Sequence, residues 1–298
     1  MAKKHVFVVE NDDRLDRAVA AADVGISRRR ARVLIAAGSV FVDGQRCRVA
    51  SRQMMAGTRV VVHAEAELAR AEAPSILWQS ADLVALAKPP GLHVNETETS
   101  ARASVVSSWP GDLYVVHRLD RDTSGVLLAA RTASAAAAAA RLFERRQIEK
   151  TYWTVTVGVP AQTHIDAPLG ADRRRPRARA GRADGQGKAS QTELRVLGEH
   201  AGLAGVEAKP RTGRTHQIRV HLAYVGCPIA GDLLYGGPAA SRLNGEVVRW
   251  PRYMLHAASL AFEWEGQRIC INAPPPEDFG GLDVLGLPGS SPPRSLTS

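Results

Sequence analysis

The feature that most constrains how this chain can fold is a cluster of charged residues between two apolar runs. It lies in the stretch VVHRLDRDTSGVLLAAR at residues 115–131. Residues 114–116 and 126–130 are predicted strands, because of their β-branched content and the glycine that separates the second run from the charged link. The link holds five ionisable side chains: His117, Arg118, Asp120, Arg121 and Asp122. A carboxylate buried between strands needs a partner. We therefore expect the fold to bring a cation to Asp120 from elsewhere in the chain.

A second charged motif, RTGRTHQIRVH at residues 211–221, offers that cation. Residues 215–225 are a predicted helix with its apolar residues on one face. Arg219 borders this face, so we expect its guanidinium to pair with Asp120 and keep the carboxylate ionised. Two other interpretations stay open. The ion pair could only stabilise the fold, or two aspartates of the link could bind a metal, which the neighbouring arginines disfavour.

The N-terminal part of the chain has the pattern of a small separate unit. Two predicted helices are followed by two predicted strands in a hairpin-like layout: residues 14–22, 27–37, 40–42 and 59–63. The second helix is capped by Ser27 and begins with four arginines: Arg28, Arg29, Arg30 and Arg32. The helix dipole disfavours cations at this end. The cluster therefore favours a phosphate-binding surface over a merely solvated face.

Composition restricts the partners of such a chain. Lys and Arg total 39 against 30 Asp and Glu, and the isoelectric point is about 9.9. A polyanion such as nucleic acid is the expected partner. No apolar run approaches the roughly 18 residues that span a bilayer, so we expect no membrane association. Three cysteines without a CxxC or HExxH motif indicate neither a disulfide framework nor a zinc site, and favour a reducing, cytoplasmic compartment.

The rest of the chain consists mostly of predicted strands, with one alanine-rich helix predicted at 132–146. Residues 173–182 hold six arginines and are a predicted flexible basic loop that contacts a nucleic-acid backbone. The predicted organisation is an N-terminal unit at 1–64, a linker at 65–75, a larger domain at 76–275 and a disordered tail, rich in Pro, Gly and Ser, at 276–298.

The charged link itself carries a resemblance to a known family. HRLDRDTSGVLL is similar to the signature of the RluA-type pseudouridine synthases, which isomerise uridine in ribosomal RNA and, in some members, transfer RNA. Further motifs resemble this family in the expected order: AKPPGLHV (87–94), EKTYW (149–153), GRTHQIRVH (213–221), GDLLYGG (231–237) and LHAASLAF (255–262). The N-terminal unit resembles the alpha-L RNA-binding domain named after ribosomal small-subunit protein four.

The resemblance implies an α+β fold. A mixed, mainly antiparallel sheet would form the catalytic domain, behind a small N-terminal α/β RNA-binding domain. It also implies a monomeric enzyme that isomerises uridines in structured RNA, with ribosomal RNA as the expected substrate and transfer RNA as the other candidate. Neither a cofactor nor a metal enters this chemistry.

By motif match, the resemblance also implies the roles of four residues. Asp120 is the catalytic aspartate, which either attacks C1′ of a flipped uridine or removes a proton from C2′. Tyr152 stacks on the base and accepts the proton of C5. Arg219 pairs with Asp120, and Arg118 fills the space that the flipped base leaves.

Other motif residues receive smaller roles. Three histidines are interpreted as structural hydrogen-bonding groups: His117, His216 and His221. The chain departs from the family pattern beside Lys88 and Pro89, with Ala87 in place of Asn and Asn95 in place of His, which makes the local loop structure harder to predict. Two further functions stay open: a catalytically silent RNA-binding ribosome assembly factor and a metal-dependent nuclease.

Overall fold

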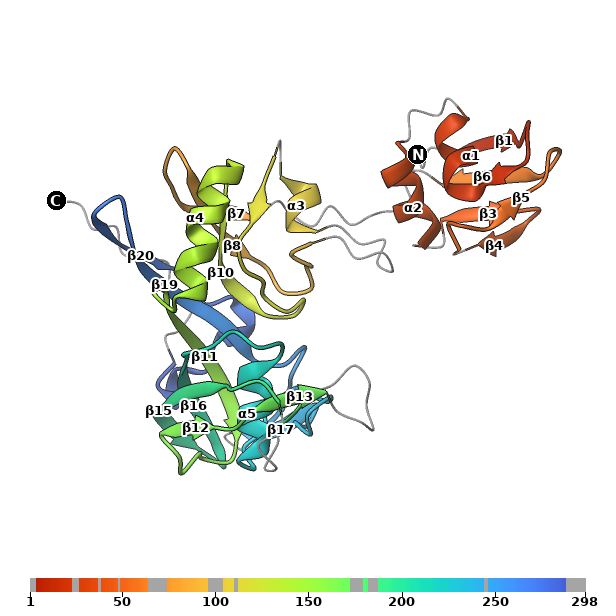
Figure 1. Ribbon diagram of the computed structural model, residues 1–298. Helices are drawn as coiled ribbons and strands as arrows, with labels where there is room; N and C mark the ends of the chain where they lie inside the picture. The colour runs from red at the N-terminus through yellow and green to blue at the C-terminus, as the bar shows by residue number, and fades with distance from the viewer. Residues whose placement is uncertain are drawn as a thin grey trace. The chain divides into compact units, whose positions relative to one another are not determined.

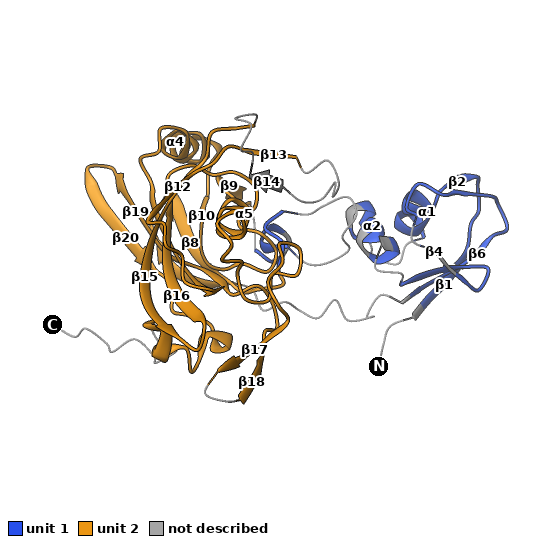
Figure 2. Cartoon of the chain, turned by 90° about the horizontal axis from the view of Figure 1, so that it is seen from below, with its two compact units in different colours: residues 1–73, 92–110 blue, residues 74–91, 111–298 orange. Residues whose placement is uncertain are grey.

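The computed structural model describes residues 4–22, 27–36, 39–47, 49–63, 74–95, 104–109, 112–171, 179–181, 187–243 and 246–287 of the 298-residue chain. Its elements are labelled in Figure 1. The chain divides into two compact units, coloured in Figure 2: residues 1–73 with 92–110, and residues 74–91 with 111–298. We call the first the N-terminal unit and the second the larger unit.

The N-terminal unit is an antiparallel sheet in the order β1-β6-β3-β4 with two helices. Its strands are β1 (Lys4–Val8), β3 (Val40–Val42), β4 (Gln45–Cys47) and β6 (Arg59–His63), with β2 (Asp13–Arg14) and β5 (Gln53–Met54) as a separate pair. Its helices are α1 (Leu15–Ala21), α2 (Arg28–Ala36) and the short α3 (Val105–Ser108). Apolar side chains of α1, α2, β3 and β6 form one core. The predicted helices and strands of this unit are thus present.

Local chemistry explains two boundaries in this unit. The hydroxyl of Ser27 accepts a hydrogen bond from the backbone N–H of Arg30 at 3.2 Å, as an N-cap does. The turn between β3 and β4 has positive φ at Asp43 (48°) and Gly44 (78°), which suits the Asp-Gly pair of a tight hairpin. The predicted helix stops at Gly25 and Gly38 lie outside the described residues.

The larger unit is built on one large sheet in the order β12-β15-β16-β11-β19-β10-β8-β7. Strand β20 also pairs with β19, and β9 with β10. The strands are β7 (Ser75–Gln79), β8 (Leu83–Lys88), β9 (Tyr114–Val115), β10 (Ser124–Ala130), β11 (Glu149–Val157), β12 (His164–Asp166), β15 (Gln191–His200), β16 (Leu203–Pro210), β19 (Leu255–Trp264) and β20 (Gln267–Asn272). Among the described strands, β10 and β19 pair in parallel and the other pairs are antiparallel. The predicted mixed, mainly antiparallel sheet is confirmed.

Two helices and two small hairpins complete this unit. Helix α4 (Ala133–Glu144) packs on β10 (Figure 1), and the hydroxyl of Thr132 caps it by accepting a bond from the N–H of Ala135. Helix α5 (Gln217–Tyr224) packs its buried Ile218 and Leu222 into the core beside β16. The hairpins pair β13 (Leu169–Ala171) with β14 (Arg179–Gly181), and β17 (Ala240–Leu243) with β18 (Glu246–Arg249). Both helices predicted in this part of the chain are present.

The parallel contact between β10 and β19 depends on a glycine. Gly125 has a φ of +116°, and a Cβ there would lie 2.1 Å from the carbonyl oxygen of Ala257. The two backbones can approach this closely only because the side chain is absent. The charged link therefore ends where β10 meets the central strand of the sheet.

The prediction that the disordered tail begins at residue 276 is wrong. Residues 276–287 contain two 3-10 helices, η1 (Glu277–Phe279) and η2 (Asp283–Leu285). Their apolar side chains are buried in the core of the larger unit: Phe279, Leu282, Leu285 and Leu287. Burial of this apolar surface offsets the entropy of ordering a segment with three glycines. Residues 288–298, and most of the predicted linker at 65–75, lie outside the described residues.

Candidate active site

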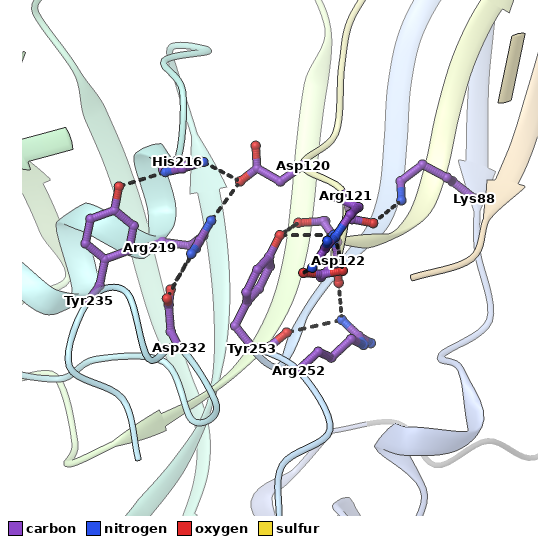
Figure 3. A network of polar contacts seen from close by, with 11 residues as sticks. Lys88, Asp120, Arg121, Asp122, His216, Arg219, Asp232, Tyr235, Arg252 and Tyr253 are labelled. Carbon is purple, nitrogen blue, oxygen red and sulfur yellow. Dashed lines mark hydrogen bonds and ion pairs between the residues drawn. The ribbon is translucent and has the colours of Figure 1, made fainter. Parts of the chain in front are cut away.

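The loop between β9 and β10 carries the charged link, and buried side chains hold its backbone (Figure 3). Lys88 Nζ donates to the carbonyl of Arg121 at 2.8 Å and to that of Pro89 at 2.9 Å. Arg252 Nη1 donates to the carbonyl of Asp122 at 2.8 Å, and the N–H of Asp122 donates to Tyr253 Oη at 3.2 Å. These contacts fix the direction in which Asp120 points.

Arg219 and Asp120 lie together, as the two charged motifs suggested. Arg219 Nη1 is 3.4 Å from Asp120 Oδ2. The shorter bonds of Arg219 go to a second carboxylate, with Nε 2.7 Å from Asp232 Oδ2 and Nη2 2.8 Å from Asp232 Oδ1. Asp232 was missed in the sequence, although it lies inside the GDLLYGG motif. Figure 3 shows the guanidinium between the two carboxylates.

Aromatic rings fix the plane of this guanidinium. Its central carbon lies 4.0 Å from the ring centre of Tyr253 and 5.0 Å from that of Tyr235. Burial alone would lower the pKa of Arg219, but the hydrogen bonds and the charge of Asp232 outweigh burial and raise it. Arg219 is therefore a permanent, immobile positive charge beside Asp120.

Tyr152 lies on β11, where the register with β19 shifts between Thr151 and Tyr152, and it lines the same pocket as Asp120. Burial raises the pKa of the Tyr152 phenol, and the negative charge of Asp120 raises it further. The phenol of this pocket-lining residue is therefore neutral at rest.

The pocket has a volume of about 460 Å³ and is lined by residues of the charged link, β11 and the segment before α5. Several cationic side chains line it: Arg118, Arg146, Lys150, Arg211 and Arg214. Burial and the nearby Arg146 lower the pKa of Lys150 to about 8, and its ammonium donates to the carbonyl of Thr212 at 3.1 Å. Arg118 is exposed at this pocket. A negatively charged ligand matches this lining.

The three motif histidines differ in their surroundings. His117 is partly buried and lines the pocket, its Nε2 accepts the N–H of Leu128 at 2.8 Å, and desolvation of the ring lowers its pKa to about 3. His221 is buried and within bonding distance of Thr192 Oγ1 and the carbonyl of Ala167. Both are structural hydrogen-bonding groups, as interpreted from the sequence.

His216 faces the site more directly. It has a φ of +58° at the N-cap of α5, its Nδ1 is 2.7 Å from Tyr235 Oη, and its Nε2 is 3.8 Å from Asp120 Oδ2. A left-handed backbone at a residue with a side chain is strained, and such strain is concentrated at functional sites. Its structural bond to Tyr235 therefore orients the ring toward Asp120.

The family departure at Ala87 leaves regular structure in place, whereas Asn95 lies in a bend. Ala87 is an ordinary position of β8, paired with Val126 and Ser75. Lys88 is 1% exposed, and burial lowers its pKa to about 7 although the charge of Asp122 opposes the shift. Lys88 supports the backbone of the loop between β9 and β10, since the two hydrogen bonds described above go to backbone carbonyls.

In the N-terminal unit, the arginines at the start of α2 have an internal partner. Arg28 Nε and Arg32 Nε lie 3.1 Å and 2.7 Å from Asp16 Oδ2, and Arg14 Nε lies 3.1 Å from Asp16 Oδ1. The carboxylate of Asp16 is fully buried, so it offsets part of the repulsion that the sequence left unexplained. Arg30 is exposed, and the Arg29 side chain lies outside the described part.

Within the described residues, no three His, Cys, Asp or Glu side chains are grouped as metal ligands would be. Among those same residues, no helix combines the length and the apolar character needed to cross a membrane. The carboxylates of Asp120, Asp122 and Asp232 contact arginines.

Comparison with known proteins finds family matches in both parts of the chain. A model described as RNA pseudouridylate synthase matches residues 82–224, and a model of the S4 domain matches residues 13–60. Ribosomal large subunit pseudouridine synthase D of Vibrio cholerae is 31% identical over 289 residues, covering 89% of this chain and 89% of that protein. The protein of that name from Xanthomonas campestris is 32% identical over 297 residues, covering 90% and 87%.

Solved structures agree with these sequence matches. Human RNA pseudouridylate synthase domain containing 4 has a TM-score of 0.57 at 26% identity, over 69% of this chain and 90% of that one. Human RNA pseudouridylate synthase domain containing 1 has a TM-score of 0.55 at 31% identity, over 68% and 84%.

An S4 domain joined to a sheet with a carboxylate–guanidinium pair in a basic pocket defines an RNA-modifying enzyme. The chain belongs to the RNA pseudouridylate synthase family. The resemblance carried by HRLDRDTSGVLL is therefore confirmed, together with the enzyme class, the α+β fold and RNA as the partner.

Proposed function

We propose that this enzyme converts uridines of ribosomal RNA to pseudouridine, with Asp120 as its catalytic residue. The observation that carries the proposal is the position of Asp120, which lines a basic pocket with Tyr152 and contacts Arg219. The relatives named as ribosomal large subunit synthases support ribosomal RNA as the substrate, and transfer RNA is the second candidate. A ribosomal substrate supports the cytoplasm as the location of the enzyme.

The reaction changes one glycosidic bond and one proton. Asp120 acts on the ribose of the bound uridine, either as a nucleophile at C1′ or as a base at C2′. As a nucleophile, Asp120 forms a bond to C1′ while the bond between C1′ and N1 breaks, and C5 later displaces the carboxylate from C1′. As a base, Asp120 removes the C2′ proton while the bond between C1′ and N1 breaks, and it returns the proton to C2′ when C5 bonds to C1′. In both routes the uracil turns in the pocket between the two steps. C5 then loses its proton while N1 gains one, so the sum of atoms is unchanged. Arg219 places a positive charge beside the carboxylate of Asp120 for the first step.

Two further residues act on the base. Unpairing and flipping a uridine cost a few kcal/mol, least in an RNA loop. Stacking on an aromatic ring returns roughly 1–3 kcal/mol, which the face of Tyr152 supplies. Arg118, exposed at the pocket, occupies the space from which the base came. Because the Tyr152 phenol is neutral at rest, it can accept the C5 proton only after its own proton has moved to a neighbour such as Asp120.

The N-terminal unit binds RNA phosphates through the arginines of α2. Arg28 and Arg32 contact Asp16 through Nε, so the outer nitrogens of both guanidinium groups can reach a phosphate. We take the enzyme to act as a monomer, with an RNA-binding domain at 1–64 and a catalytic domain that begins near residue 76.

Asp120→Asn tests the proposal. Amide and carboxylate have nearly the same shape, but only the carboxylate can act as nucleophile or base. We expect the variant to keep RNA affinity within a few-fold and to release less than about 1% of the wild-type tritium from RNA labelled at C5 of uridine. The matched control is Asp122→Asn, whose carboxylate pairs with Arg121 instead of Arg219. Turnover above that level in Asp120→Asn would move the catalytic role to another residue.

Mapping of pseudouridines tests the substrate. Ribosomal and transfer RNA from cells with and without this gene are compared site by site. A site lost only in ribosomal RNA supports the proposal, and one lost only in transfer RNA contradicts it. If the protein were a catalytically silent assembly factor, cells without the gene would have the same pseudouridine sites as cells with it. The Asp120→Asn substitution would then leave its function unchanged.

A further inference from the structure

The segment at residues 276–287 packs on a complementary surface of the sheet in the larger unit, which we call its seat. Gly198 and Gly205 are cross-strand partners in β15 and β16. A Cβ at Gly205 would lie 2.1 Å from the carbonyl oxygen of Leu285, and one at Gly198 would lie 2.9 Å from its carbonyl carbon. The backbone of η2 therefore occupies space that only glycine leaves open. This is the packing of a specific element, since a loosely attached tail needs no such space.

The other end of the same segment, at η1, binds Arg252. Asp278 of η1 accepts two bonds from this guanidinium, with Nε 2.6 Å from Oδ2 and Nη2 2.9 Å from Oδ1. The Arg252 side chain is 6% exposed, and its central carbon lies 5.6 Å from the ring centre of Phe279. A buried guanidinium needs partners for most of its five donors.

The remaining donors of Arg252 go to the loop that carries Asp120. Nη1 donates to the carbonyl of Asp122 at 2.8 Å, and Nη2 donates to Ser124 Oγ at 3.1 Å. Nη1 also lies 2.9 Å from the carbonyl of Leu255, where β19 begins. One side chain thus ties the loop to the central strand, and Figure 3 shows Arg252 beneath Asp122.

We propose that Asp278 is a positioning residue for the reaction, because it holds Arg252 in the orientation that fixes the Asp120 loop. The segment at 276–287 is then part of the catalytic apparatus rather than an appendage. This inference rests on the proposed catalytic role of Asp120. A displacement of Asp120 of about 1 Å can cost about a hundredfold in rate without weakening RNA binding.

The test compares Asp278→Asn with Glu277→Gln in the full chain. Glu277 is the exposed neighbour, so the control removes the same charge without touching Arg252. Turnover is measured as tritium release from protein-free ribosomal RNA labelled at C5 of uridine. We expect Asp278→Asn to lower kcat by about tenfold or more while KM changes by less than about threefold. Asp278→Glu, which keeps a carboxylate, should recover most of the loss. Equal kcat values for Asp278→Asn and Glu277→Gln overturn the proposal.

A second variant covers the case in which Asp278→Asn does not fold. Arg252→Lys keeps the positive charge opposite Asp278, but an ammonium lacks the planar fork that reaches Asp122 and Ser124 together. We expect kcat to fall more than KM changes in the folded variant, whose folding is checked by its unfolding temperature, and a wild-type kcat overturns the proposal. Asp120→Asn is measured in the same series. If that variant is active, the proposed function fails; if it is inactive while Asp278→Asn and Arg252→Lys are fully active, only the positioning role fails.

Discussion

At the scale of single residues, Arg219 divides its donors unequally between two carboxylates. Asp232 takes two bonds of 2.7 and 2.8 Å, and Asp120 is left with one contact of 3.4 Å. The arrangement orients the guanidinium through Asp232, which is 1% exposed and has no access to substrate. Asp120 therefore has a nearby positive charge without a short, bidentate bond that would occupy both of its oxygens.

Tyr152→Phe separates the two roles proposed for Tyr152. The phenyl ring keeps the stacking face and removes the hydroxyl, so RNA binding should persist within a few-fold. If the hydroxyl takes the C5 proton, the turnover number should fall by about 10²–10⁴-fold, as for loss of a general base. Single-turnover rates of tritium release measure the effect.

The control for this change is Tyr224→Phe, since Tyr224 is half exposed on α5 and does not line the pocket. A wild-type rate for Tyr152→Phe would leave stacking as the role of this residue.

At the scale of elements, a single buried carboxylate joins α1 to α2. Asp16 lies on α1, and its partners Arg28 and Arg32 lie on α2. Burial alone would raise the pKa of Asp16, but the bonds from Arg32, Arg28 and Arg14 outweigh burial and lower it to about 2. The helix pair is therefore stabilised by an interaction that depends on pH.

The sign of that dependence follows from the direction of the shift. A carboxyl with a lower pKa in the folded state contributes its full stability above its unfolded pKa of 3.8 and loses it as the pH falls toward about 2. The shift corresponds to at most about 2 kcal/mol, and less because the arginine partners are partly exposed and screened.

Urea unfolding of the wild-type and Asp16→Asn chains from pH 6 to pH 2 measures this contribution. The stability difference between the two chains should be largest near neutrality and shrink below pH 4. Asp13→Asn is the control, since Asp13 pairs with Arg17 at the surface. A difference that stays constant down to pH 2 would show that the ion pairs of Asp16 contribute nothing.

The sequence predicted elements whose signals are local. Ser27 marked the start of α2, and the β-branched runs marked the strands on both sides of the charged link. It did not predict η1 and η2, because the Pro, Gly and Ser content of residues 276–298 as a whole indicated disorder. The apolar residues of η1 and η2 pack on the sheet only because β15 and β16 carry a pair of glycines there. Local composition cannot report a complementary surface that lies far earlier in the chain.

In the candidate site, too, residues within recognisable motifs could be predicted, whereas contacts between distant segments could not. Motif matches identified Asp120, Tyr152 and Arg219, and the structure brings the three into one pocket. The groups that orient them were missed, because Asp232 and Arg252 act through contacts between distant segments. A carboxylate in GDLLYGG has no feature in the sequence that assigns it to Arg219 rather than to solvent.

At the scale of the whole molecule, the enzyme has two compact units with separate cores. Asp120 and Arg219 lie in the larger unit, and the arginines at the start of α2 lie in the N-terminal unit. Loss of those arginines should therefore weaken RNA capture without changing the chemical step.

Changing Arg28, Arg29, Arg30 and Arg32 to Gln tests this division. The KM for structured RNA should rise much more than kcat falls. The slope of log affinity against log salt should flatten by up to about 0.7–0.9 for each phosphate that the variant no longer neutralises. Arg195→Gln with Arg268→Gln is the comparison, since both arginines are exposed on the larger unit and paired with glutamates. An unchanged salt slope would show that the α2 arginines are solvated surface, and a collapse of kcat alone would place them in the active site.

The seat of residues 276–287 also sets an order of events during synthesis. Ribosomes add roughly 5–20 residues per second, so Asp278 follows Asp120 by on the order of ten seconds. In that interval the N-terminal unit already has the residues of its own core, whereas Arg252 lacks its carboxylate partner. On this inference, the growing chain acquires its affinity for RNA early and its catalytic competence last. If Asp278 has this positioning role, modification by unfinished chains is slower than modification by the complete enzyme.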